Sequence, residues 1–335
     1  MKHQEISNEN QIILFDLIQK ELSANLSLVN VISDLLDISA DAAYRRIRGV
    51  KPIDFEEAVK LCRHFQISMD SFANITRKNK IQCNYLPLNL SDFNSYMIYM
   101  QTLSANIERI KTSPKGQIIL SALDIPVFNM LAYKELTFFK IFSWYKNVYG
   151  FSAGYDEFVE GLNTDELLKL YEKIVKDYQL IPSTEIWTSN TIDTFLRLLS
   201  YHYETGSFND EKFPLFLCEQ LLDMMTTLQN WTEKGTKGSQ DVPLNFYVSE
   251  TDLEGTFIIL KQQEKTSCIL KLYTINSLST TDELFCQETE NWLNNAAQRA
   301  TLISGASAKT RYKFFNDQRQ KIRFLIEKLQ LNSEK

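Results

Sequence analysis

The stretch from Val31 to Glu56 constrains the fold of this chain more than any other, because it predicts two helices joined by a tight turn. The first helix is marked by apolar residues at helical spacing, which are Val29, Ile32, Leu35 and Leu36, with Ile38 after the turn. Ser39 is a good N-cap for a second helix, and Gly49 is suited to end it. That second helix, from Ala40 to Arg48, has a narrow apolar side and a polar side that we expect to be exposed.

Two more helices complete this N-terminal part. The first of them begins at Pro52 and the capping pair Asp54 and Glu57, and its apolar face contains Phe55, Ala58, Val59, Cys62 and Phe65. The other is a short closing helix from Ile67 to Phe72, for which Ser68 is the cap. We therefore expect a small all-helical domain over residues 1–80.

The second helix and the turn after it have the opposite charge to the chain as a whole. The full sequence has a net charge of −6. Between Ala40 and Lys51 there is only one acidic residue, Asp41, and four basic ones, so that this segment has a net charge of +3: Arg45, Arg46, Arg48 and Lys51. A local excess of positive charge is what contact with phosphates requires. The plain alternative is a helical hairpin whose basic end is only solvated.

At these residues the chain resembles the lambda-repressor-like (XRE-type) helix-turn-helix family of bacterial transcriptional regulators. The residues that match are Ile38-Ser39, Arg45 to Gly49, Lys51-Pro52 and the tail from Leu61 to Asp70. The match covers about a fifth of the chain. It departs from the family pattern at Ser33, where the family has another small residue, and at Asp37, which replaces the turn glycine. The second apolar position of the recognition helix falls at Ile47, one residue later than in the family pattern. The resemblance implies a five-helix DNA-binding domain in a sequence-specific, dimeric regulator of transcription, with double-stranded DNA as its partner.

The hydrogen-bond donors and acceptors of DNA then suggest a role for each polar residue of the second helix. The residues expected to face base edges in the major groove, where arginine pairs with guanine and aspartate accepts from cytosine, are Asp41, Tyr44, Arg45 and Arg48. Those expected to hold phosphates are Arg46, Lys51 and the amide groups near Ser39.

Two other classes of function stay open at this point. A protein-interaction adaptor whose helix-turn-helix no longer contacts DNA is favoured by the acidic composition, with a pI of about 5.3, and by the replaced turn glycine. The hypothesis of an enzyme in the C-terminal region rests only on the aromatic-rich stretch 116–144, which we expect to be core. Three histidines, five scattered cysteines and the lack of a glycine-rich phosphate motif predict no catalytic residue, metal or cofactor.

With 335 residues, of which 44% are hydrophobic, the chain needs at least one further domain. No apolar run reaches the roughly 18 residues that cross a bilayer, and the first residues lack a signal-peptide pattern, so we expect a cytoplasmic protein without membrane contact. The remaining length exceeds what dimerisation needs, which favours a regulatory region that senses a small-molecule or peptide effector.

After a predicted linker at residues 81–90, the segment from Ser91 to Lys111 predicts a long helix with a heptad seam. The seam residues are Phe93, Tyr96, Met100, Leu103, Ile107 and Ile110. Because operators with two-fold symmetry need two DNA-binding units, we interpret this seam as a homodimer contact. Packing within its own domain is an equally good interpretation.

The remainder, residues 91–335, predicts a helical dimerisation and sensor domain. Amphipathic helices are expected at Thr164 to Tyr178, Ser189 to Tyr203, Phe213 to Trp231, Asp282 to Ala297 and Ser307 to Leu331. Short segments rich in β-formers predict a three-stranded antiparallel meander within residues 244–273. The predicted fold class is thus mainly α, with a five-helix N-terminal domain followed by a larger helical domain and a small antiparallel β-meander.

Overall fold

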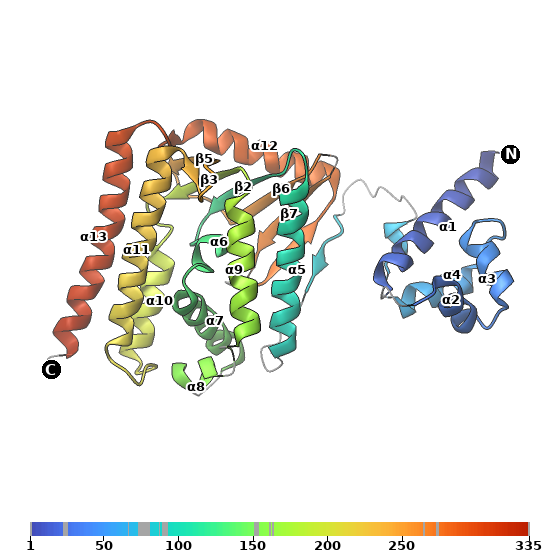
Figure 1. Cartoon of the computed structure of the whole chain (residues 1–335), viewed down its shortest axis with the longest axis horizontal. Coiled ribbons are helices and arrows are strands. Elements are labelled where there is room, and N and C mark those ends of the chain that lie inside the picture. Colours follow the sequence, from blue (N-terminus) through green and yellow to red (C-terminus); the bar gives the residue numbers. More distant parts are fainter. Residues whose placement is uncertain are drawn as a thin grey trace. The chain divides into compact units, whose positions relative to one another are not determined.

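A computed structural model of the protein describes residues 2–22, 26–65, 67–72, 81–86, 88, 93–150, 154–160, 162, 164–263, 265–272 and 275–333. The chain divides into unit 1 (Met1–Lys80) and unit 2 (Ile81–Lys335), each with a hydrophobic core of its own. Figure 1 labels the helices of both units and several strands of unit 2.

Unit 1 is all-helical in the residues that the structure describes. Its elements are α1 (Lys2–Glu21), α2 (Leu28–Leu36), α3 (Ala40–Ile47), α4 (Phe55–His64) and the 3-10 helix η1 (Met69–Ser71). Leu14 and Ile18 from α1 are buried in one core with Ile32, Ala43 and Leu61 from the next three helices. The helices expected from the caps after Ser39 and Asp54 are confirmed.

Unit 2 is built on a nine-stranded mixed sheet, so the predicted fold class, a helical domain with a small antiparallel meander, is wrong. The strand order is β1-β8-β7-β6-β2-β3-β5-β4, and β9 also pairs with β5. The strands are β1 (Asn84–Tyr85), β2 (Gln117–Ala122), β3 (Ser183–Thr188), β4 (Thr236–Lys237), β5 (Val242–Ser249), β6 (Phe257–Lys261), β7 (Thr266–Lys271), β8 (Ser277–Thr280) and β9 (Thr301–Leu302).

The three strands of the predicted meander form as β5, β6 and β7, and β6 and β7 pair antiparallel as expected, but the expected pairing of β5 with β6 is wrong. β5 is parallel to β3, and β3 is parallel to β2. β6 pairs with β2 and with β7, both antiparallel, so β5 and β6 are not neighbours in the sheet. Segments that are adjacent in sequence are therefore separated in the sheet by two strands from earlier in the chain.

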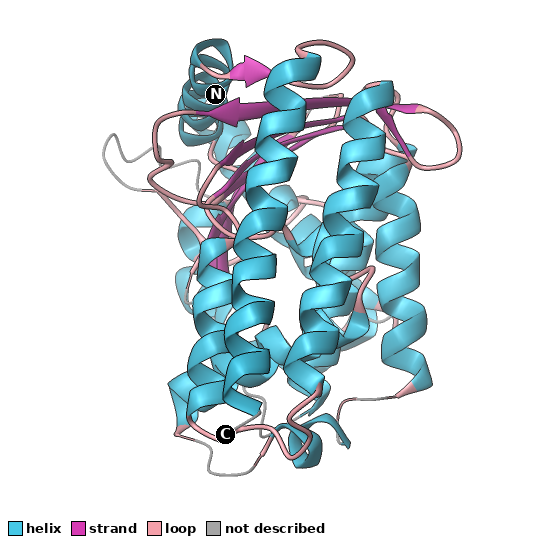
Figure 2. Ribbon diagram, turned by 90° about the vertical axis from the view of Figure 1, so that its left-hand side faces the viewer, coloured by secondary structure: helices cyan, strands magenta, loops and turns pink. Residues whose placement is uncertain are grey.

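Helices cover both faces of this sheet. On one face, α12 (Glu283–Arg299) packs on Ile119, Ile186 and Ile259. On the other face lie the long helices, which Figure 2 shows running side by side along one side of the strands. The helices other than α12 are α5 (Phe93–Thr112), α6 (Val127–Met130), α7 (Lys134–Tyr149), α8 (Tyr155–Glu160), α9 (Asp165–Gln179), α10 (Asp193–Glu204), α11 (Phe213–Lys234) and α13 (Ala308–Ser333). The five amphipathic helices expected from the sequence correspond to α9, α10, α11, α12 and α13.

The described residues of the predicted linker, 81–86 and 88, belong instead to unit 2. Asn84 and Tyr85 form β1, which pairs with β8, and Leu88 is buried in the core. None of the helices in the described part of the chain is long and apolar enough to cross a membrane.

The predicted dimerisation seam is buried inside unit 2. Tyr96, Met100, Ile107 and Ile110 are at most 2% exposed, and Leu103 packs against the same core. α5 packs on α9, where the Tyr96 and Tyr171 hydroxyls lie 2.6 Å apart. The side chain of Phe93 lies outside the described residues. The heptad spacing marks a contact within the chain. These residues are therefore not available on the surface for the homodimer contact that we expected.

Candidate nucleic-acid interface

The turn between α2 and α3 closes without a glycine. Asp37 adopts the left-handed conformation, with φ of 55°, and its backbone N–H donates to the carbonyl of Ser33. The Ser33 hydroxyl donates to the carbonyl of Ile38 over 2.6 Å. Asp is one of the few residues that adopt this conformation at low cost. Two departures from the family pattern, Ser33 and Asp37, thus form the turn together.

α3 presents a polar face to solvent. Ser39 caps the helix by accepting from the Ala42 backbone N–H over 3.2 Å, and Ala43 is fully buried. The side chains on the outer face are exposed: Asp41, Tyr44, Arg45 and Arg48. The Arg48 guanidinium lies over the Tyr44 ring, 5.9 Å from its centroid, which is a cation–π arrangement. Lys51 follows in the exposed turn beyond Gly49.

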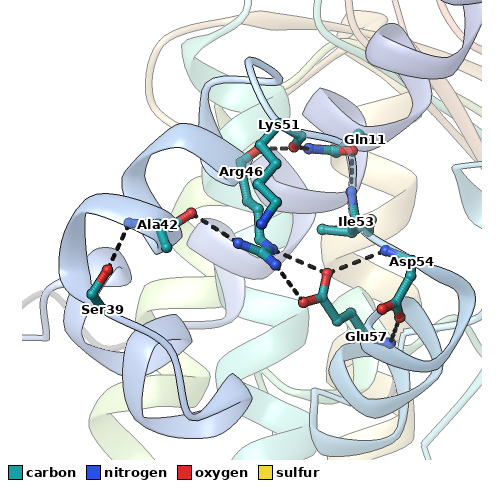
Figure 3. A network of polar contacts seen from close by, with 8 residues as sticks. All are labelled: Gln11, Ser39, Ala42, Arg46, Lys51, Ile53, Asp54 and Glu57. Carbon is teal, nitrogen blue, oxygen red and sulfur yellow. Dashed lines mark hydrogen bonds and ion pairs between the residues drawn. The ribbon is translucent and has the colours of Figure 1, made fainter.

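Arg46 differs from its neighbours, because it points inward and is only 6% exposed. Its Nε and Nη2 atoms donate to the two carboxylate oxygens of Glu57 over 3.0 and 2.7 Å, and its Nη1 donates to the carbonyl of Ala42 (Figure 3). A bidentate arginine–carboxylate ion pair of this kind is among the strongest polar interactions in proteins. The expectation that Arg46 holds a phosphate is therefore wrong, and Arg46 instead ties α3 to α4.

Glu57 has a second partner in the same network. Its Oε2 accepts from the Asp54 backbone N–H over 3.2 Å, while the Asp54 carboxylate accepts from the Glu57 N–H over 2.7 Å. This capping box begins α4. One carboxylate thus fixes the start of α4 and the orientation of α3 (Figure 3).

Gln11 of α1 holds the loop between α3 and α4. Its amide nitrogen donates to the carbonyls of Arg46 and Lys51 over 2.6 and 2.9 Å, and its amide oxygen accepts from the Ile53 N–H over 2.9 Å (Figure 3). Gln11 is 5% exposed. Gln11 could not be predicted as a functional residue, because its partners lie 35 to 42 positions away and no local pattern connects them.

The exposed surface of this segment has a smaller charge than the sequence suggested. Arg46 is neutralised by Glu57, which leaves Arg45, Arg48 and Lys51 against Asp41, a net charge of +2. Two apolar side chains in and just beyond this segment are also exposed: Val50 is 66% exposed and Phe55, the first residue of α4, is 68% exposed. Phe55 was expected on the buried face of its helix, but it occupies the first position after the cap and stays in solvent.

Unit 2 contains a buried lysine beside a serine, a combination that some hydrolases use. The Nζ of Lys237 donates to the Ser183 hydroxyl over 2.7 Å and lies 3.3 Å from the centroid of the Tyr178 ring. Ser183 is 2% exposed and Lys237 is fully buried, so this arrangement favours a structural role. In the described residues, no group of His, Cys, Asp and Glu could hold a metal ion.

No family model matches this sequence, and neither does any curated protein with which it was compared. Among solved structures, the chain is similar to TrmBL2, an archaeal chromatin protein whose structure is described as showing a novel mode of DNA binding. The two are 10% identical, and the alignment covers 87% of this chain and 98% of that one with a TM-score of 0.26. A similarity this weak supports no conclusion about fold or function.

Proposed function

We propose that this protein is a sequence-specific DNA-binding regulator of transcription, and that unit 1 contacts DNA through α3. The observation that supports this most is the division of α3 into two faces. Ala43 and Arg46 fix the helix to its neighbours, while Arg45 and Arg48 extend into solvent. A short helix held rigidly on one side, with exposed cations on the other, suits insertion into the major groove.

In the proposed complex, Arg45 and Arg48 donate to the O6 and N7 atoms of guanine, and Asp41 accepts from the N4 amino group of cytosine. Tyr44 lies on the same face. Lys51 and the amide groups next to Ser39 hold backbone phosphates and set the register. Arg46 serves to position α3 and contacts no phosphate, and the Gln11 bonds keep Lys51 at a fixed place relative to the helix.

A protein-interaction adaptor is the second candidate, and the exposed apolar residues beside the cations favour it. Val50, Phe55 and Tyr44 are each more than half exposed. Aromatic side chains next to arginine are typical of the central residues in protein–protein interfaces.

Selection of bound fragments from a random genomic library distinguishes these functions. The full chain is expected to enrich a short consensus, and fluorescence anisotropy should show that it binds this duplex about a thousandfold more tightly than a scrambled duplex of the same composition. A palindromic consensus would mean that two copies bind together. If no sequence is enriched and the affinity for DNA does not depend on salt, the adaptor is the better account.

A further inference from the structure

Unit 2 contains a cavity of about 90 Å³ between the sheet and the helices α5, α6 and α7. The sheet contributes residues of β2, β6 and β7 to its wall. Most of the wall is aliphatic, and it includes Met100, Leu120, Met130, Ile258 and Ile269. A wall of this kind favours hydrocarbon over water.

Two lysines interrupt the aliphatic wall. Lys140 from α7 and Lys271 from the end of β7 both line the cavity. Their Nζ atoms lie 2.8 and 3.2 Å from the same carboxylate oxygen, Oδ2 of Asp124. The other carboxylate oxygen, Oδ1, accepts from the backbone N–H of Ile125 over 2.8 Å. Two lysines therefore share one carboxylate, and the cluster has a surplus of one positive charge when both are protonated.

Lys140 is short of acceptors. It is 4% exposed, and apart from its ion pair with Asp124 the described residues supply no hydrogen-bond partner for its Nζ. An ammonium group has three N–H donors, and leaving them unsatisfied in an apolar environment is costly. Burial lowers the pKa of Lys140, which the charge of Asp124 partly offsets. Burial would raise the pKa of Asp124, but the charges of Lys140 and Lys271 lower it to about 2. Asp124 therefore stays ionised, but its single negative charge cannot fully balance both Lys140 and Lys271.

We propose that this cavity binds a small monocarboxylate with a short apolar body, whose carboxylate lies between Lys140 and Lys271. The anion supplies the missing acceptors and cancels the surplus charge, while the hydrocarbon part contacts the aliphatic wall. An engineered cavity of about 150 Å³ holds benzene. The smaller volume found here selects a chain of only a few carbons, such as a short linear or branched fatty acid. Such a ligand would be an effector of unit 2, and its binding does not depend on the proposed DNA contact.

Calorimetric titration of the full chain with butyrate and isovalerate tests this inference without DNA. The matched controls are butyramide, which has the same shape without the charge, and butylamine, which has the opposite charge, all at equal ionic strength. The carboxylates are expected to bind saturably, at least about tenfold more tightly than the amide, because only they complete the lysine pair. Butylamine should give no saturable signal.

Lys271→Met is the first variant to test, because Lys271 is partly exposed and Asp124 keeps Lys140 as a partner after its removal. It should weaken butyrate binding at least about tenfold and leave butyramide unaffected. The control is Lys261→Met, because Lys261 lies on the adjacent strand β6 and pairs with Glu290 of α12 on the opposite face of the sheet. This control should bind butyrate as the wild type does.

A second variant, Ile258→Phe, keeps both lysines and fills the cavity, so it should also abolish butyrate binding. The inference is overturned if butyramide binds as tightly as butyrate, if Lys271→Met and Lys261→Met bind butyrate equally well, or if no carboxylate binds saturably. These outcomes leave the proposed DNA contact of unit 1 untouched, so the two proposals can fail separately.

Discussion

Arg45 and Arg46 are neighbours in sequence, and the fold gives them opposite environments. Successive residues of a helix are rotated by about 100° around its axis, so only one of the two can face the core side. Arg46 lies three positions after the buried Ala43, on the same face, while Arg45 is in solvent. The helical spacing alone placed Arg46 on the inner face. Its charge nevertheless suggested exposure, because the partly buried Glu57 carboxylate that neutralises it lies on another helix.

Arg45→Ala tests base contact by this residue. We expect the affinity for the selected duplex to fall by roughly 1 to 3 kcal/mol, with relaxed discrimination at one base pair, because a two-pronged arginine–guanine contact is lost. The affinity for random duplex should change little. Anisotropy titrations on both duplexes measure this, and equal losses on the two would show that Arg45 contacts only the backbone.

Glu57→Gln tests the positioning role of Arg46. Glutamine can still accept from the N-cap N–H, so the capping box survives, but the guanidinium loses its counter-charge while it remains buried. We expect the protection of the α3 amides against hydrogen exchange to fall by roughly 3 kcal/mol. Glu56→Gln removes the adjacent exposed carboxylate and should change the protection by less than about 0.5 kcal/mol. Equal effects of the two variants would contradict the role given to Arg46.

Lys237 predicts a pH dependence for the stability of unit 2. Burial lowers the pKa of its ammonium to about 7, and the charge of Glu185 partly opposes this. The unfolded chain keeps the proton up to a pKa near 10.4, so above pH 7 it binds more protons than the folded protein and stability rises with pH. Relative to Lys237→Met, the wild type should gain roughly 1 kcal/mol per pH unit between about pH 7 and 8.5.

The comparison with Lys237→Met cancels the opposite contribution of the buried cysteines. Burial raises the pKa of Cys218 and Cys268 to about 12. Urea unfolding at several pH values measures the difference, with Lys234→Met as the control because Lys234 is exposed on the preceding helix. Parallel stability curves for the wild type and Lys237→Met would mean that Lys237 titrates normally.

Among the elements, local signals predicted the helices and the strands β5, β6 and β7, but they did not predict β2 and β3 or the sheet that joins all five. The caps at Ser39 and Asp54 act within three residues, so the sequence shows them directly. β3 offers no such signal, because all six of its residues are buried and the alternation that marks a half-exposed strand is absent. Its partners β2 and β5 lie about 60 residues away on either side in sequence. Pairing of that kind depends on the whole unit.

The α5 seam shows the same limit, because a heptad pattern does not identify its partner. Ile107→Ala should destabilise unit 2 by roughly 2 to 5 kcal/mol, since Ile107 is fully buried against its own chain. Ile98→Ala on the same helix should have an effect within about 0.5 kcal/mol, because Ile98 is 50% exposed.

All four tryptophans lie in unit 2, so their fluorescence during urea unfolding reports on this unit alone. The unfolding midpoint of Ile107→Ala should be the same at low and high protein concentration. A midpoint that recovers as the concentration is raised would show that the seam joins two chains after all.

In the whole molecule, the proposed DNA-contacting helix of unit 1 is specified by local sequence, whereas the cavity of unit 2 is not. In unit 1, the basic helix α3, its cap and the glycine that ends it lie within a dozen residues, so this helix and the exposed Arg45 and Arg48 could be predicted. In unit 2, Lys140, Lys271 and Asp124 meet across up to 147 positions of sequence. Only the folded sheet brings them to one cavity. A DNA contact and a carboxylate site on separate units would let a regulator sense a metabolite of that class.

The salt dependence of DNA binding tests the central proposal most directly. The full chain, Arg45→Ala/Arg48→Ala and Arg63→Ala are titrated with the selected duplex between about 50 and 200 mM salt, where phosphate contacts make the affinity fall steeply. Arg63 is an exposed cation in the last turn of α4, and its removal controls for the loss of a positive charge outside α3. A steep decline in affinity is expected for the wild type and Arg63→Ala, and a loss of at least about a hundredfold at every salt concentration for the double variant. Binding by the double variant that equals that of the wild type would contradict it.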